Sequence, residues 1–190
     1  MEGTVTLDGE PVRSGSPRDA IRQGLFLAPE DRRNEGLITA MVIRENITLP
    51  ALPQYASACL IQKGKERAVA EDMRGKLHIK APTIESEVRG LSGGNQQKVV
   101  LAKWLSLEPK CLVFDEPTRG IDVGARAEIY GLMKGLAERG VAILVISSDM
   151  EEVIGISDRV ICMHEGRVSG ILQGHEASEE QIMRLAVASA

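Results

Sequence analysis

Two short runs made only of apolar residues constrain the fold of this chain most strongly. The first is CLVF at residues 111–114, and the second is VAILVI at residues 141–146. Such runs are typical of strands buried on both faces, as the strands of parallel sheets are. Between residues 125 and 136 apolar residues recur at helical spacing, which predicts a helix. Strand, helix and strand in this order indicate an α/β fold around a mostly parallel sheet.

Turn and cap residues divide the rest of the chain into elements. Asp122 can cap the predicted helix, and Gly140 can end it. GTVTLDGEPV alternates polar and apolar residues around Asp8-Gly9, which predicts a hairpin. SPRDAIRQG predicts a short helix, capped by Ser16, before the short strand and charged loop of LFLAPEDRR.

Residues 45–108 have a mostly helical pattern, with a loop near KAPTIESEV. After residue 146 we expect a short helix and then the strands RVICM and RVSGIL, joined by a turn at Glu165-Gly166. Ser178 and Gln181 form a capping-box pattern that predicts a last helix.

Composition narrows the class of protein. The net charge is −4, which argues against a nucleic-acid partner, because nucleic-acid binding usually requires a basic face. Cys59, Cys111 and Cys162 are widely spaced, so we expect reduced thiols in a cytoplasmic protein. No apolar run approaches the roughly 18–20 residues of a membrane span.

CLVFDEPTRGID is the strongest chemical signal in the sequence. It places two adjacent carboxylates, Asp115 and Glu116, at the carboxyl end of a predicted buried strand, where α/β sheets bind ligands. Asp115 is suited to hold Mg²⁺ through water, and Glu116 to orient a water that attacks a phosphate. On these two residues alone, a plain acidic turn after a strand is the alternative.

RGLSGGNQQKVV, about twenty residues earlier, is the second signal. Ser92, Gly93 and Gly94 directly precede a predicted helix, and glycines let the backbone approach a phosphate closely. The alternative for these three residues is an ordinary serine N-cap with a flexible glycine entry.

Together, LSGGNQQKVVLAKWL and CLVFDEPTRGIDVGARAEIY resemble the nucleotide-binding domain of ABC transporters. NQQK, RGIDVGA and the earlier APEDRRNEGL are similar to the second such domain in two-domain ATPase subunits of bacterial sugar importers of the ribose, galactose and xylose type. The resemblance covers essentially the whole chain. It implies a P-loop NTPase-like fold with a helical subdomain inserted into the mostly parallel sheet.

The resemblance also implies site residues. Ser92, Gly93, Gly94 and Gln96 match the signature loop that binds ATP held by another domain. Asp115 and Glu116 match the Walker B aspartate and the catalytic glutamate, and Asp122 matches the aspartate of a loop at the dimer interface. The domain organisation is then residual N-terminal strands and a loop over 1–44, a helical subdomain over 45–108, and core strands with a C-terminal hairpin and helix over 109–190.

One departure from the family pattern concerns the phosphate-binding loop. G-x-x-x-x-G-K-[ST] occurs nowhere in the 190 residues. We therefore expect a partial domain whose P-loop portion is missing, with no useful ATP binding or activity on its own. Since the strand and helix around that loop would be absent, exposed apolar surface and a tendency to associate are also expected.

Two single positions also depart. Glu30 stands where the family usually has a glutamine that senses the metal; Glu30 can bind Mg²⁺ through water, or can be a solvated loop residue paired with Arg32 or Arg33. Ser148 stands where a histidine usually contacts the γ-phosphate, so weakened hydrolysis is expected. Alternatively, Ser148 and Glu151 form a capping box.

The resemblance implies an ATPase that uses ATP and Mg²⁺ to import carbohydrate. Its partners would be a second nucleotide-binding domain, the transmembrane permease subunits and, indirectly, a periplasmic sugar-binding protein, but no nucleic acid. Its location would be cytoplasmic and peripheral, on the inner face of the cell membrane. Two alternatives are a soluble ABC ATPase of translation or DNA repair, and an inactive truncated remnant.

Overall fold

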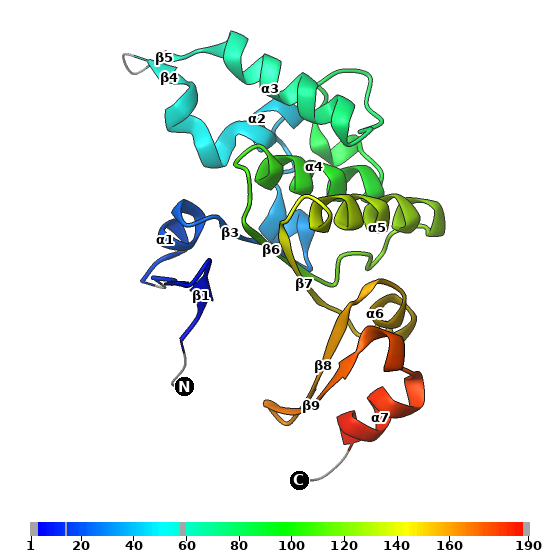
Figure 1. Ribbon diagram of the computed structural model, residues 1–190. Coiled ribbons are helices and arrows are strands. Elements are labelled where there is room, and N and C mark those ends of the chain that lie inside the picture. The colour runs from blue at the N-terminus through cyan, green and yellow to red at the C-terminus, as the bar shows by residue number, and fades with distance from the viewer. Residues whose placement is uncertain (1–3, 14, 58–59, 188–190) are drawn as a thin grey trace. The chain divides into compact units, whose positions relative to one another are not determined.

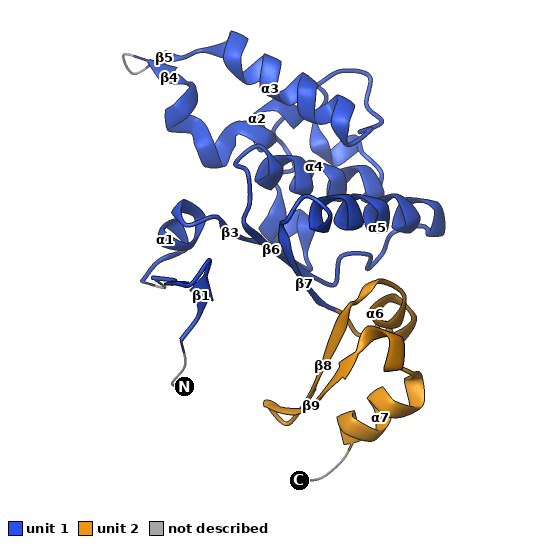
Figure 2. Ribbon diagram, in the orientation of Figure 1, with its two compact units in different colours: residues 1–146 blue, residues 147–190 orange. Residues whose placement is uncertain are grey.

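The computed structural model describes residues 4–13, 15–57 and 60–187 (Figure 1). Its chain divides into two compact units, residues 1–146 and residues 147–190, which Figure 2 shows in blue and orange. Cys59, one of the three expected thiols, lies outside the described residues. Cys111 and Cys162 are free, and burial raises the pKa of both thiols.

A parallel sheet forms the centre of the first unit. Its strands are β3 (Leu25–Ala28), β6 (Cys111–Asp115) and β7 (Ala142–Ile146), in the order β3-β6-β7. Both neighbouring pairs run parallel, which confirms the prediction from the two apolar runs. Helix α5 (Val123–Ala137) connects β6 to β7, as its apolar spacing predicts.

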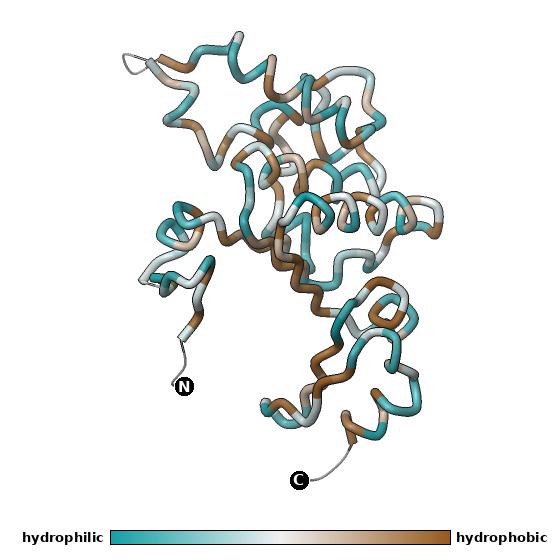
Figure 3. Tube along the Cα trace, viewed as in Figure 1, coloured by the Kyte–Doolittle hydropathy of each residue, from teal (hydrophilic) through white to brown (hydrophobic). Residues whose placement is uncertain are grey.

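The two faces of this sheet differ. Phe26, Leu112 and Phe114 point to one face and are buried, where α5 and α4 (Gly93–Leu105) pack against the strands. On the other face Leu144 is 47% and Ile146 is 50% exposed. The prediction that β7 is buried on both faces is therefore wrong, whereas the expectation of exposed apolar surface is confirmed. Figure 3 shows the apolar colour along these strands.

Residues between β3 and β6 are mostly helical, as expected, and form their own core. Ile43, Ile47, Val88 and Val99 are fully buried within it. A small antiparallel hairpin interrupts the helices, which the sequence pattern did not reveal. The elements in order are a π-helical turn (Arg32–Gly36), α2 (Ile43–Thr48), a 3-10 segment (Leu49–Tyr55), β4 (Ala56–Ser57), β5 (Leu60–Ile61), α3 (Lys63–Lys76), a 3-10 turn (Val88–Gly90) and α4.

A buried ionic cluster joins α2 to α3 and to the loop after α3. Arg44 donates to Glu66 at 2.9 Å and to Glu85 at 2.9 Å, and the hydrogen bond from Arg44 lowers the pKa of Glu85. Thr48 donates to the other oxygen of Glu66 at 2.7 Å. The Glu66 carboxylate is thus satisfied at both oxygens although its side chain is only 3% exposed.

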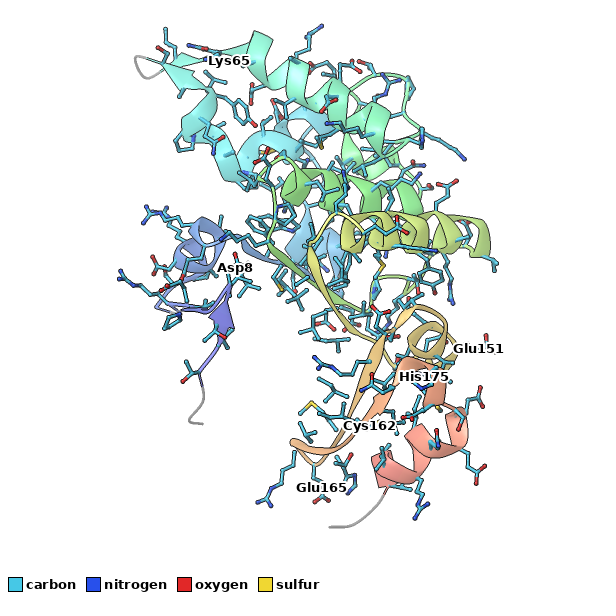
Figure 4. All side chains as sticks on the ribbon, in the orientation of Figure 1. Asp8, Lys65, Glu151, Cys162, Glu165 and His175 are labelled. Carbon is cyan, nitrogen blue, oxygen red and sulfur yellow. The ribbon has the colours of Figure 1, made fainter. Side chains whose placement is uncertain are left out.

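The N-terminal part of the first unit has the predicted hairpin and helix. Strands β1 (Thr6–Leu7) and β2 (Glu10–Pro11) pair antiparallel through a turn in which Asp8 and Gly9 have positive φ. The Asp8 carboxylate, labelled in Figure 4, pairs with Lys110 at 2.7 Å, just before β6. Helix α1 (Pro17–Arg22) begins after Ser16, whose hydroxyl accepts from the Asp19 amide, as its cap predicts.

The second unit is a hairpin with two helices. Its elements are α6 (Met150–Ile156), β8 (Arg159–His164), β9 (Arg167–Gln173), a 3-10 turn (Gly174–Glu176) and α7 (Glu179–Val187). Glu165, at the hairpin tip in Figure 4, and Gly166 both have positive φ, as the turn prediction requires. The Ser178 hydroxyl accepts from the Gln181 amide at 3.3 Å, which confirms the predicted cap of α7.

Candidate functional site

The chain end of β6 presents the two candidate carboxylates. Asp115 is the last residue of the strand and pairs in register with Ile146. Glu116 follows with φ of +46°, and its amide donates to the Ile146 carbonyl at 2.9 Å. A non-glycine residue in the left-handed region is strained, and such residues concentrate at functional sites. The strand thus ends in a bend at Glu116 that a backbone hydrogen bond holds.

A tight turn connects these carboxylates to α5. The Arg119 amide donates to the Glu116 carbonyl at 3.2 Å, and the Ile121 amide donates to the Thr118 carbonyl at 3.1 Å. Asp122 then caps α5, accepting from the Ala125 amide at 2.9 Å, as the sequence predicts. Asp115, Glu116 and Asp122 are therefore positioned by one short, hydrogen-bonded segment.

Ser92 is the N-cap of α4. Its hydroxyl oxygen accepts from the backbone amide of Asn95 at 3.4 Å and from the Asn95 side chain at 2.9 Å. The positive end of a 13-residue helix therefore lies at this loop. This geometry is compatible with an ordinary helix N-cap and with a phosphate-binding loop, because a serine that caps a helix also lies where a phosphate would meet the helix N-terminus.

Both glycines of this loop are closely packed, and the packing around Gly94 leaves no space for a side chain. A Cβ on Gly93 would lie 2.6 Å from the Arg32 guanidinium and 3.1 Å from the Gly120 carbonyl. A Cβ on Gly94 would lie 2.6 Å from Cβ of Ala125, at the start of α5. The Ser92-Gly93-Gly94 loop is therefore packed directly against the turn that follows Glu116.

Gln96 is placed inside the protein. Its side chain is 1% exposed, donates to the Val88 carbonyl at 3.1 Å and accepts from Arg33 at 3.2 Å. Its amide group is thus used to join α4 to two neighbouring segments. Its predicted contact with nucleotide stays a prediction.

Glu30 lies exposed after β3. Its carboxylate forms an ion pair with Arg119, in the turn after Glu116. The pairing with Arg32 or Arg33 considered from the sequence is therefore wrong in its partner: the arginine that pairs with Glu30 is distant in sequence, which local spacing could not show. The role of Glu30 toward Mg²⁺ stays a prediction.

Ser148 lies in the second unit, at an exposed position before α6. The predicted capping box of Ser148 and Glu151 is wrong by one residue. Asp149 is the N-cap and accepts from the Glu152 amide at 3.2 Å, while the Ser147 hydroxyl accepts from the Asp149 amide. Aspartate caps helices at least as well as serine, and the helix begins one residue later.

A polar cavity of about 230 Å³ opens beside the signature loop. Lys98, on α4, lines this cavity, donates to the His78 carbonyl at 3.1 Å and pairs with Glu128 of α5. This hydrogen bond lowers the pKa of Glu128. Sequence reasoning missed this pair because its members are 30 residues apart, on different helices. The lining residues are Lys80, Ser92, Gly94, Asn95, Lys98, Asp122, Gly124, Ala125 and Glu128.

The oxygen ligands around β6 suit a magnesium ion that takes its remaining ligands from elsewhere. In the part of the chain that the structure describes, no three His, Cys, Asp or Glu side chains gather closely enough to hold a metal alone. Mg²⁺ commonly takes one or two carboxylates and completes its shell with water and phosphate oxygens. Asp115, at the carboxyl end of a parallel strand, is a donor of this kind.

Known proteins place this arrangement in a family. The profile described as "ABC transporter" matches residues 1–119. The chain therefore belongs to the ABC transporter family. Its fold agrees with a solved dimeric ATP-binding cassette, MJ0796, in a post-hydrolysis state with ADP and Pi, at a TM-score of 0.74 and 24% identity; the match covers 90% of this chain and 73% of that one.

Two curated relatives are sugar import proteins. The chain is 50% identical, over 184 residues, to a putative ribose/galactose/methyl galactoside import ATP-binding protein of Pseudomonas fluorescens. It is also 50% identical, over 185 residues, to the ribose import ATP-binding protein RbsA of Geobacillus kaustophilus. Each match covers 97% of this chain but only 36% and 37% of those relatives. Across residues 4–13, 15–57 and 60–187, no helix has both the length and the apolar character needed to cross a membrane.

Proposed function

We propose that this chain is part of the ATP-hydrolysing subunit of an ABC importer for a carbohydrate. The observation that carries the proposal is the packing of the Ser92 loop against the turn that joins Glu116 to Asp122. This packing joins the two motifs that such an ATPase needs. The carbohydrate class is supported by the printed functions of the two import relatives.

The carboxylates take distinct roles. Asp115 holds Mg²⁺ through water, and when bound the ion neutralises charge on the phosphates. Glu116 orients and polarises the attacking water, since its backbone is fixed in a bend at the strand end. Asp122 fixes the start of α5 at the domain interface. Gln96 acts from inside the protein by holding the α4 end of the signature loop.

The signature loop serves ATP held by another domain. No phosphate-binding lysine motif occurs in the 190 residues, so we propose that the phosphate loop comes from a segment outside them. The open face of the β3-β6-β7 sheet supports this, because the half-exposed Leu144 and Ile146 are apolar surface that a further helix would cover. A solved cassette of the same fold is a dimer with ADP and Pi. In the proposed assembly, two nucleotides lie between two such domains.

The whole assembly follows from the same proposal. Residues 1–44, 45–108 and 109–190 would be the N-terminal strands, the helical subdomain that docks on the permease, and the core strands. The partners would be a second nucleotide-binding domain, the permease subunits and, indirectly, a periplasmic sugar-binding protein. The subunit would lie in the cytoplasm, peripheral to the membrane.

A transplant tests the proposal. The matching segment of the Geobacillus import protein is replaced by these 190 residues, and the chimera is assayed for ATP turnover. We expect hydrolysis that Glu116→Gln lowers by about 10²–10⁴-fold while ATP still binds, because a positioned general base contributes that much. Glu138→Gln, at an exposed position after α5, is the control and leaves turnover unchanged. Turnover that survives Glu116→Gln contradicts the assignment.

Ser148 is tested in the same chimera. We expect Ser148→His to raise the ATP turnover number, because an imidazole can contact the γ-phosphate where a hydroxyl cannot supply a titratable group. Equal turnover with serine and histidine would remove the argument that this position weakens hydrolysis.

The two rival functions make different predictions. A soluble ABC ATPase of translation or DNA repair would co-purify with RNA or DNA rather than with a membrane permease. An inactive remnant would give a chimera that folds, measured by cooperative unfolding, but hydrolyses no ATP.

A further inference from the structure

Arg32 joins two parts of the site that are far apart in sequence. It lies in the π-helical turn after Glu30, and its guanidinium reaches the turn after Glu116. One terminal nitrogen donates to the Arg119 carbonyl at 2.9 Å and the other to the Gly120 carbonyl at 3.3 Å. The planar fork of an arginine suits two adjacent acceptors, so this contact fixes both position and direction.

The same guanidinium lies under the signature loop. A Cβ on Gly93 would lie 2.6 Å from Nη2 of Arg32, so Gly93 is held against this side chain. The Gly120 carbonyl, which accepts from Arg32, would lie 3.1 Å from that Cβ. Arg32 therefore contacts the loop that starts α4 and the turn that precedes α5 at one point.

The guanidinium of Arg32 is partly desolvated where it meets the two loops. Desolvation lowers the pKa of Arg32, and the like charge of Arg33 lowers it further by a smaller amount. Its Nε is buried and, within the described residues, meets no hydrogen-bond acceptor. Arg32 thus donates to two neutral carbonyls rather than to a carboxylate, and its buried Nε donor carries an uncompensated desolvation cost.

We propose that Arg32 is a positioning residue that couples the turn after the candidate catalytic Glu116 to the signature loop of the same domain. A displacement of the turn moves the Arg119 and Gly120 carbonyls, these move the guanidinium, and the guanidinium moves Gly93. Since Glu116 acts on the ATP of its own domain and Gly93 on the ATP of the other, Arg32 links the two ATP sites. The coupling rests on the proposed function, whereas the contacts themselves do not.

Hydrogen exchange of the 190-residue chain tests the contacts without ATP. We expect Arg32→Gln to speed exchange of both the Ile121 amide and the Asn95 amide at least about tenfold, because both loops lose their common support. Arg139→Gln is the matched control: this exposed arginine also donates to a carbonyl, that of Gly135, but only within its own helix end. It should leave both amides within about twofold.

Amides of α3 report whether a variant loosens the whole protein. If the α3 amides also exchange faster in Arg32→Gln, the test is repeated with Arg32→Lys. A lysine ammonium keeps the positive charge but cannot donate to two carbonyls with the planar geometry of a guanidinium. A faster Ile121 amide with an unchanged Asn95 amide in either variant overturns the coupling.

The chimera supplies the second readout. We expect Arg32→Gln to lower kcat for ATP by about tenfold while KM changes less than about threefold, because geometry is lost without a direct ATP contact. A larger change in KM than in kcat overturns the positioning role. An unsubstituted chimera without turnover defeats the proposed function alone, since the exchange result stands by itself.

Discussion

The helical region and the central sheet of the first unit close their cores to different degrees. Around α2 and α3 even charged groups are sealed: Glu66 is 3% exposed and satisfied at both oxygens. In the sheet, Leu27, Leu144 and Ile146 on one face are each about half exposed. The difference indicates that the helical region is a complete folding unit, whereas the sheet requires further structure to cover it.

The largest effect is expected in the sealed cluster. Arg44→Met leaves Glu66 buried without its charge partner and should lower the free energy of unfolding by about 3–5 kcal/mol. Urea unfolding measures it. Arg67→Met is the control, because its ion pair with Glu85 is exposed and 3.5 Å long, and it should change stability by at most about 1 kcal/mol. Equal losses would contradict the difference drawn between sealed and open regions.

The two sheet faces give the next contrast. Leu112→Ala, on the covered face, should cost about 3 kcal/mol, because it opens a cavity under α5 and α4. Leu144→Ala, on the open face, should cost less than about 1 kcal/mol and reduce self-association measured by sedimentation. A loss at Leu144 as large as that at Leu112 would show that the open face is covered in solution.

Lys103 adds a pH dependence to the helical side. Burial lowers the pKa of Lys103 from 10.5 to about 8. In the folded protein the Lys103 ammonium donates to the Gly36 carbonyl and lies 4.8 Å from the Trp104 ring centre. Between these two pH values the unfolded chain binds more protons than the folded chain. The free energy of unfolding therefore rises with pH across this window, by about 2–3 kcal/mol.

Comparison with a variant isolates the contribution of Lys103 to the pH dependence of the free energy of unfolding. Lys103→Met should lose the rise between pH 8 and 10, whereas Lys134→Met, exposed on α5, should keep it. Parallel pH profiles for the original chain and Lys103→Met would contradict the assignment.

The smallest effect concerns the junction between the two regions, where Gly94 meets Ala125. Gly94→Ala should cost about 1–3 kcal/mol through overpacking, and adding Ala125→Gly should return part of that loss. Gly75→Ala, in α3 with open space around it, should instead stabilise by about 0.5–1 kcal/mol. A double variant that shows the plain sum of two losses would argue against this contact.

Local signals in the sequence predicted the local structure well. The β6 and β7 strands, the Asp122 cap of α5 and both hairpin turns follow from patterns within a few residues. The errors and omissions arose from contacts between distant residues or from choices between equivalent caps. Arg32 meets Arg119 across 87 residues, Glu30 pairs with Arg119 rather than a neighbour, and Asp149 replaces Ser148 as cap.

The prediction that β7 is buried on both faces was wrong for a related reason. The apolar sequence of a strand indicates that burial of both faces is favourable. It does not show whether other elements among the described residues pack on each face. The same limit applies to the site. Its motifs identify Ser92 and Asp115, whereas the packing of Gly93 and Gly94 against the segment after Glu116 depends on the three-dimensional fold.

Calorimetric titration of the 190-residue chain with millimolar MgATP tests the central claim most directly. If the signature loop is half of a site whose phosphate loop lies in another segment, the chain alone gives no saturable heat. A clear binding isotherm, lost in Asp115→Asn, would show that these residues hold nucleotide by themselves and would contradict the claim.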